Sequence, residues 1–242
     1  MKKLRTILCA VSALVLTSMT TSPLLADSSN FAGPYVGFQM AAVGVELDGQ
    51  VASAGDDVGE TTTGNVGRTA IIGGLELGYA IPLGDAGVLL DVGANYVAGG
   101  AKMRTNNTDT AATADVIFEV DDMYSIFLAP SFALSETSSL FVKLGYTHAT
   151  VSVSGDVTKP DDMEGATYAI GTRSVLDSGL FIRTEAGITA FDSLSAQGLG
   201  SGGGAGCAST SNACNSKSVE TTTNVSADPT VAYGSVSIGM RF

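Results

Sequence analysis

The last eleven residues, from Ala232 to Phe242, read Ala-Tyr-Gly-Ser-Val-Ser-Ile-Gly-Met-Arg-Phe. Apolar and polar side chains alternate strictly here, which predicts a β-strand with one apolar face. That face consists of Val236, Ile238, Met240 and Phe242. Because chain termini usually fray, an apolar face that reaches the last residue needs a surface to cover it. A lipid bilayer outside and a tight polar interior inside would provide that cover. The alternative is the closing strand of a soluble sandwich.

The first 26 residues are typical of a secretory signal peptide. Three basic residues lie among the first five, an apolar run extends from Ile7 to Leu16, and the stretch ends at Ala26. A basic start, a short apolar core and a small residue at the cut site define such a peptide. The apolar run is shorter than the ~18 residues of a membrane-spanning helix. We therefore expect cleavage after Ala26 and export of a mature domain of residues 27–242.

Composition excludes several classes of function. The chain has 12 Lys and Arg against 24 Asp and Glu, and removal of three basic residues with the leader changes the net charge from −12 to 9 − 24 = −15. So acidic a chain repels phosphates, which excludes nucleic acid as a partner. With no Trp and a single histidine, His148, around which no serine motif is found, the chain lacks the usual material of a catalytic site. We predict no enzyme activity, no cofactor and no metal site.

Two cysteines remain after cleavage, Cys207 and Cys214. In an oxidising compartment they are expected to form a disulfide instead of staying free. The bond would close a short loop and contribute little to global stability. A metal site is the weaker alternative, because no histidine lies nearby.

Eight segments of the mature chain alternate in the manner of strands, and each exceeds the about 9–11 residues that a tilted strand needs to cross a bilayer. They cover approximately 34–45, 69–81, 88–101, 116–134, 139–153, 165–176, 179–191 and 229–242. Tight turns rich in Gly, Pro, Ser and Asp follow the second, fourth and sixth segments. The remaining connections are long and polar: 46–68, 102–115, 154–164 and 192–228. This order predicts an all-β fold, an eight-stranded antiparallel up-and-down transmembrane β-barrel with short periplasmic turns and long outer loops.

Within the segments, the charged side chains share a face with Gly and Phe, opposite the apolar face. Parity therefore predicts an interior charge network of Glu76, Asp91, Lys143, Arg173, Arg183, Glu185 and Arg241. One interpretation is a structural network in which each buried charge is paired, since unpaired burial is costly. The other is a charged gate in a narrow water path. An eight-stranded barrel is just wide enough for its own side chains, which favours the first interpretation.

Several stretches resemble the eight-stranded outer-membrane barrels, the group that includes the barrel domain of OmpA, OmpX and the "porin family" surface antigens of Gram-negative bacteria. The similarity lies in Phe141–Tyr146 after a short turn, Ala169–Gly171, Phe181–Ala186, the opening Gly33–Phe38 and the terminal Phe242. The resemblance implies an outer-membrane location and recognition of the terminal strand, with its apolar face as assembly signal, by the barrel-assembly machinery. The chain ends at the barrel, so no cell-wall-binding domain is expected.

These observations lead to a structural or surface-interaction role without catalysis. Lipid and lipopolysaccharide of the outer membrane are the expected surroundings, and the loops are expected to contact any extracellular partner. Acidic clusters such as Asp161–Asp162 are expected to be ordinary solvated loop residues, with weak divalent-cation bridging to lipopolysaccharide as the alternative. Two further hypotheses stay open: a narrow porin-like channel for small solutes, and a lipid-modifying enzyme.

Overall fold

The computed structural model describes residues 27–52, 61–84, 87–99, 101–105, 116–154, 158–176, 178–201 and 217–242. In order, the elements of this part of the chain are η2 (Ser28–Phe31), β1 (Gly33–Ala52), β2 (Thr61–Pro82), β3 (Val88–Ala98), β4 (Ala101–Thr105), β5 (Val116–Ser135), β6 (Ser138–Ser154), β7 (Met163–Val175), β8 (Leu180–Phe191), β9 (Leu194–Ser201) and β10 (Lys217–Arg241). Within these ranges, no helix is long and apolar enough to cross a membrane.

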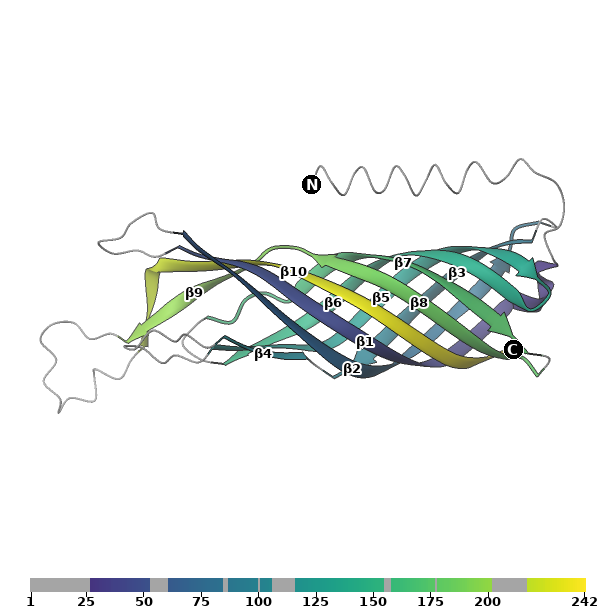
Figure 1. Ribbon diagram of the computed structural model, residues 1–242, viewed down its shortest axis with the longest axis horizontal. Helices are drawn as coiled ribbons and strands as arrows, with labels where there is room; N and C mark the ends of the chain where they lie inside the picture. The colour runs from purple at the N-terminus through teal and green to yellow at the C-terminus, as the bar shows by residue number, and fades with distance from the viewer. Residues whose placement is uncertain are drawn as a thin grey trace, which may run out of the picture.

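The strands form one closed antiparallel barrel, which lies with its long axis horizontal in Figure 1. Neighbours follow the order β1-β2-β3-β5-β6-β7-β8-β10, and β1 pairs with β10 to close the wall. β4 follows β3 and pairs with the same neighbour, β5, while β9 follows β8 and likewise pairs with β10. Eight strands therefore make the wall, which confirms the predicted eight-stranded up-and-down barrel.

Some strands extend beyond the predicted segments on the side of the long connections. β1 and β2 remain paired as far as Ala52 and Thr61, inside the predicted loop 46–68. β10 begins at Lys217, inside the predicted loop 192–228. Those loop boundaries were wrong because backbone pairing continues where the side chains no longer have an apolar face. Alternation of hydropathy reports which side chains face lipid and does not report where hydrogen bonding ends.

The predicted strand 88–101 is broken. β3 ends at Ala98, and Gly99 has a φ of 96°, a conformation that glycine adopts far more readily than other residues. The β2–β3 ladder ends at the same level, with Gly73 opposite Ala98. β4 then continues along the same neighbour, β5, beyond the break.

The three predicted tight turns are confirmed. Leu83 N donates to Val88 O at 2.8 Å in the first, Ser135 pairs with Ser138 across the second, and Gly179 N donates to Leu176 O at 2.9 Å in the third. Phe242 lies at the same end, where its backbone N donates to Pro34 O at 2.9 Å. In outer-membrane barrels the end with short turns is periplasmic.

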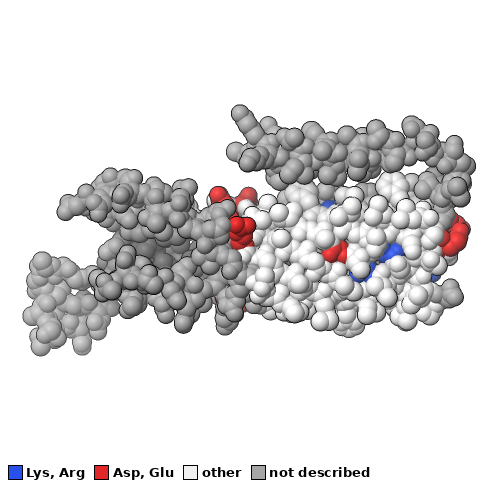
Figure 2. Space-filling view, in the orientation of Figure 1, with Lys and Arg blue, Asp and Glu red and all other residues white. Residues whose placement is uncertain are grey.

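The outer face of the wall is apolar, as predicted for the terminal strand. The exposed fractions are 50% for Val236, 59% for Ile238, 41% for Met240 and 72% for Phe242. Ser235 and Ser237 alternate with them and are buried in the barrel. In Figure 2 most of the described wall is white, with acidic groups toward its two ends and a few small basic and acidic patches between them. Such a band suits lipid contact.

The interior is filled in layers. Near the short turns, an apolar cluster includes Phe31, Tyr35 and Phe181. Phe127 and Phe141 form a second cluster, and a third in the outer half includes Val45, Val151, Met163, Phe191 and Val231. The apolar outer layer departs from the tight polar interior that the terminal strand predicted. The charged and hydroxyl side chains lie between these layers.

Candidate functional site

Inward-facing charges from different strands meet around Arg183 on β8, whose side chain is buried. Its Nη1 donates to Glu76 Oε1 at 2.8 Å and lies 3.9 Å from Asp91 Oδ2, while Nη2 donates to Glu185 Oε2 at 3.3 Å. Arg183 is 1% exposed, and Glu76 and Asp91 are 1% and 0% exposed. Because a guanidinium presents donors in a planar fork, one side chain links three carboxylates.

Two further cations complete the arrangement. Lys143 Nζ donates to both Glu185 oxygens, at 3.0 and 3.3 Å, and Arg173 Nη2 donates to Asp91 Oδ2. Tyr233 OH also donates to Glu185 Oε1, at 2.5 Å. Three carboxylates thus face three cations, an arrangement without net charge that we call the ion cluster: Glu76, Asp91, Lys143, Arg173, Arg183 and Glu185. Parity predicted these inward positions, and the structure brings them together.

Aromatic rings surround the cations. Arg183 Cζ lies 3.9 Å from the centroid of Phe141, Lys143 Nζ lies 4.3 Å from that of Phe127, and Arg173 Cζ lies 4.8 Å from that of Tyr35. A cation over the face of a ring is attracted by the ring quadrupole, more strongly where water is excluded. The rings therefore supply both packing and charge compensation.

Glycines in the wall make room for these rings. A Cβ placed on Gly93 would lie 2.5 Å from Phe127 Cζ and 2.6 Å from Leu77 O. Such contacts are closer than van der Waals packing allows, so only glycine fits beneath this ring. The predicted mixture of Gly and Phe on the charged face has this physical origin.

Arg241 lies elsewhere than the sequence indicated. Its Nη1 donates to Ser29 O at 3.3 Å and to Ala32 O at 3.2 Å, so it holds η2 and, among the described residues, has no ion pair in the cluster. The same segment places Phe31, 1% exposed, in the short-turn end of the lumen. Ser29 N donates to Asp27 Oδ1 at 2.9 Å, which holds the pKa of the Asp27 carboxyl below its usual value. Parity predicted that Arg241 faces inward, but it could not predict that Arg241 lies at the short-turn end of the barrel, away from the ion cluster.

A ring of neutral polar side chains lies next to the ion cluster and was missed by the sequence reasoning. Four hydroxyls form a hydrogen-bonded chain, with 2.8 Å from Ser125 to Thr147, 2.6 Å from Thr147 to Thr167, and 2.8 Å from Thr167 to Thr189. With two amides they line one cavity, and we call the set the polar ring: Gln39, Asn95, Ser125, Thr147, Thr167 and Thr189. The sequence signal that could have predicted the ring is a small polar residue at an inward position in several successive strands.

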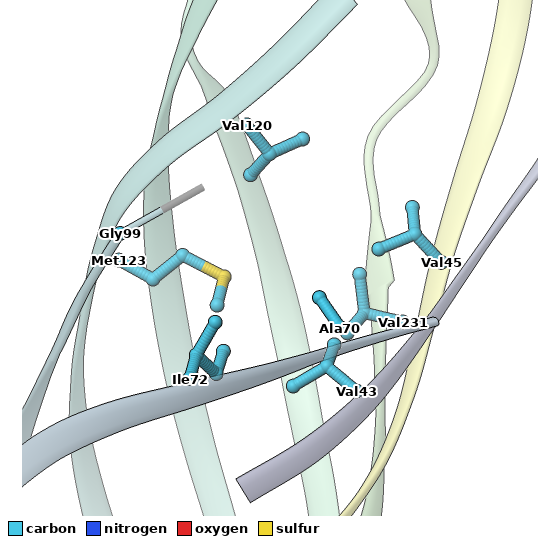
Figure 3. A pocket seen from close by; sticks show the side chains of 8 residues that line it. All are labelled: Val43, Val45, Ala70, Ile72, Gly99, Val120, Met123 and Val231. Carbon is cyan, nitrogen blue, oxygen red and sulfur yellow. The ribbon is translucent and has the colours of Figure 1, made fainter. Parts of the chain in front are cut away.

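The outer half of the lumen is apolar, and Figure 3 shows a small recess there lined by side chains of β1, β2, β5 and β10. Ala70 and Ile72 come from β2, Met123 from β5 and Val231 from β10, with Gly99 at the break after β3. Its volume is about 10 Å³, close to the minimum that a single water needs. The recess is therefore a packing defect and not a ligand pocket.

A larger, polar recess of about 460 Å³ opens at the loop end of the wall. Four exposed carboxylates line it: Asp161, Asp162, Glu164 and Asp192. His148 lies beside them, half-buried, with its ring stacked on Tyr124 at 4.7 Å and its Nδ1 buried without a hydrogen-bond partner. Cys207 and Cys214 lie outside the described residues, so their disulfide stays a prediction.

The sequence matches the family model described as "Outer membrane protein beta-barrel domain" over residues 11–206. The chain belongs to this family. It is therefore an outer-membrane β-barrel protein of bacteria, and the lipid-facing band described above lies in that membrane. No curated protein matches the sequence significantly.

Solved structures of outer-membrane barrels resemble the fold at low identity. OprG from Pseudomonas aeruginosa is 12% identical with a TM-score of 0.52, over 91% of this chain and 100% of that one. Ail, the attachment invasion locus protein of Yersinia pestis, is 16% identical with a TM-score of 0.40, over 85% and 99%. Neisserial surface protein A is 12% identical with a TM-score of 0.31, over 87% and 98%. At this identity the likeness concerns the fold alone.

Proposed function

We propose that this protein is a non-enzymatic surface barrel whose lumen does not conduct and whose loop end contacts the surroundings of the cell. The observation that carries the proposal is the ion cluster, which crosses the lumen with side chains that are almost completely buried and mutually paired. Phe31 adds an apolar layer at the periplasmic end. A path for ions needs hydrated groups along its length, and paired, dry charges interrupt such a path.

Planar-bilayer conductance of the refolded, full-length protein tests this part of the proposal. We expect no stepwise current in the wild type, because opening would require several buried ion pairs to separate together. The alternative function is a narrow channel for small solutes. A channel predicts discrete current steps, with an ion selectivity that changes in Lys143→Met. That result would refute the proposed closed barrel and establish a channel.

The loop end supports the surface role. Its recess gathers exposed carboxylates, and the exposed ammonium of Lys159 lies 3.7 Å from Asp162 Oδ1. A partner that binds this rim through charge is therefore expected to be basic, and salt is expected to weaken that binding. Lipopolysaccharide joined to the rim through divalent cations is a second partner of compatible chemistry.

Topology can be tested on intact cells with epitope tags. A tag beside Asp161 is expected to be labelled, whereas tags beside Glu136 or Ser178 are expected to need permeabilisation of the outer membrane. We also propose that the barrel-assembly machinery recognises the terminal strand. The same preparation tests a further proposal, that the leader is cleaved after Ala26. Mass spectrometry of the mature protein should find Asp27 first, and reversed labelling would contradict the proposed orientation.

A further inference from the structure

The polar ring lines a cavity of about 40 Å³. Apolar side chains of the outer lumen, such as Val43 and Met123, complete its lining, together with Tyr233, which bonds to Glu185 of the ion cluster. A buried water needs roughly 10–15 Å³ of such volume, so the cavity has room for about three waters or a solute of the same size. Pairing brings neighbouring members of the ring together, since Asn95 lies opposite Ser125, Ser125 opposite Thr147, and Thr167 opposite Thr189. Most strands of the barrel thus contribute a polar group to the ring.

Polar atoms of the ring lack partners. Gln39, which is 4% exposed, has its Oε1 buried without a hydrogen bond, and so does Asn95 at Oδ1. Rotation of either amide would replace an unpaired acceptor with an unpaired donor, so each amide needs a partner in either orientation. The four hydroxyls share three hydrogen bonds, which leaves at least one hydroxyl hydrogen outside their chain. A buried polar group without a partner destabilises a fold, so a bound molecule that pairs these groups stabilises the barrel.

The chemistry of the ring selects a neutral ligand. None of its six side chains carries a formal charge. Glu185 is already bonded to Lys143, Arg183 and Tyr233. Glu76, which lies opposite Asn95 in the β2–β3 ladder, is ion-paired with Arg183. A cation would therefore have to compete with Lys143 and Arg183 for these carboxylates, and an anion would meet no cationic side chain in the ring. Water donates and accepts two hydrogen bonds each, which matches the groups that the ring presents.

We propose that the polar ring is a binding site for a fixed cluster of about three water molecules, anchored by Gln39 and Asn95. The cluster completes the hydrogen bonds of the ring between the sealed ion cluster and the apolar outer half of the lumen. This water site is independent of the surface role proposed above, because the site lies in the lumen and the surface role belongs to the loop end.

Water-to-protein magnetisation transfer tests the proposal, with the full-length protein in lipid nanodiscs and labelled Thr methyl groups. In the wild type we expect cross peaks between water and the methyl groups of Thr147, Thr167 and Thr189, with the sign of slowly exchanging buried water. In Gln39→Leu we expect these peaks to fall at least twofold. The control Val45→Ile changes an inward residue of the apolar outer cluster, and it should leave them unchanged.

Three results would overturn the proposal. Absence of the cross peaks in the wild type would show a dry ring, whatever the variants do. Threonine methyl shifts that follow added sodium or potassium chloride in a saturable way would show that the ring binds an ion instead of water. If Gln39→Leu does not fold, Asn95→Leu removes the other anchor, and undiminished peaks in that variant would also contradict the proposed anchoring.

Discussion

Lys143→Met removes one cation of the ion cluster while keeping an aliphatic side chain of similar length, so the change creates little cavity. The ammonium lies 3.0 and 3.3 Å from the two oxygens of Glu185, and the residue is 1% exposed. Breaking a buried ion pair costs about 3–5 kcal/mol, because the remaining charge is left uncompensated. Glu185 keeps Arg183 at 3.3 Å and Tyr233 at 2.5 Å, which favours the lower end of that range, about 3 kcal/mol.

Urea unfolding of the refolded protein in lipid vesicles measures this cost. Circular dichroism is the suitable signal, because the chain contains no tryptophan. The matched control is Lys159→Met, which removes the ammonium of a pair separated by 3.7 Å whose side chains are 60% and 39% exposed. A surface pair contributes less than about 1 kcal/mol, so the control is expected to unfold almost like the wild type.

The double variant Lys143→Met, Glu185→Gln completes the cycle. Removal of both charges should recover about 1 kcal/mol or more of the loss, since contacting residues are coupled and the uncompensated carboxylate is gone. Unfolding of Lys143→Met like the control, together with a cycle that shows no coupling, would refute a buried, paired Lys143. That outcome would mean that water solvates the lumen charges.

Three further changes test other parts of the structure. Gly93→Ala is expected to cost about 1–3 kcal/mol by crowding the interior ring above it, whereas Gly234→Ala, with open space around its Cβ, should be neutral in the same unfolding assay. Ile238→Asp, on the lipid face, should reduce assembly into vesicles, at a cost below the about 2–4 kcal/mol of a Lys or Arg at the bilayer midplane, and equal assembly of this variant and the wild type would contradict the facing. Arg241→Gln should release η2, measured as faster protease cleavage near residue 30, and unchanged cleavage would mean that Phe31 alone holds the segment.

The wall was predictable because two physical requirements act along the chain with period two. Lipid demands apolar side chains such as Ile238 on one face, and burial costs keep charges such as Lys143 on the other. Pairing inside the cluster was not predictable, because Arg183 meets Glu76 only through a register that brings together residues more than a hundred positions apart. The position of Arg241 likewise depends on η2, a segment from the opposite end of the chain.

Other features have no signal in hydropathy. Thr167 is an ordinary small polar residue until its hydroxyl is placed between those of Thr147 and Thr189. The apolar outer lumen was missed because the interior was predicted to be polar, although Val231 shares the inward parity of Ser235 and Ser237. The strand extensions to Ala52 and from Lys217 are defined by backbone hydrogen bonds, which any side chain permits.

The seam between β1 and β10 has a kinetic consequence. Tyr35 opposes Arg241, so the wall closes between segments about 200 residues apart, whereas the other ladders of the wall join strands that are consecutive or nearly so along the chain. The entropic cost of closing a loop grows only with the logarithm of the loop length. Closing this seam therefore costs about 3 kcal/mol more free energy than closing a ten-residue hairpin. Its contact order is nevertheless the highest in the barrel, so it should form last. Until then both edge strands expose unpaired backbone and invite pairing with other chains. In a nascent barrel of this kind, the extent of mispairing with other chains therefore increases with the time for which those two edges stay unpaired.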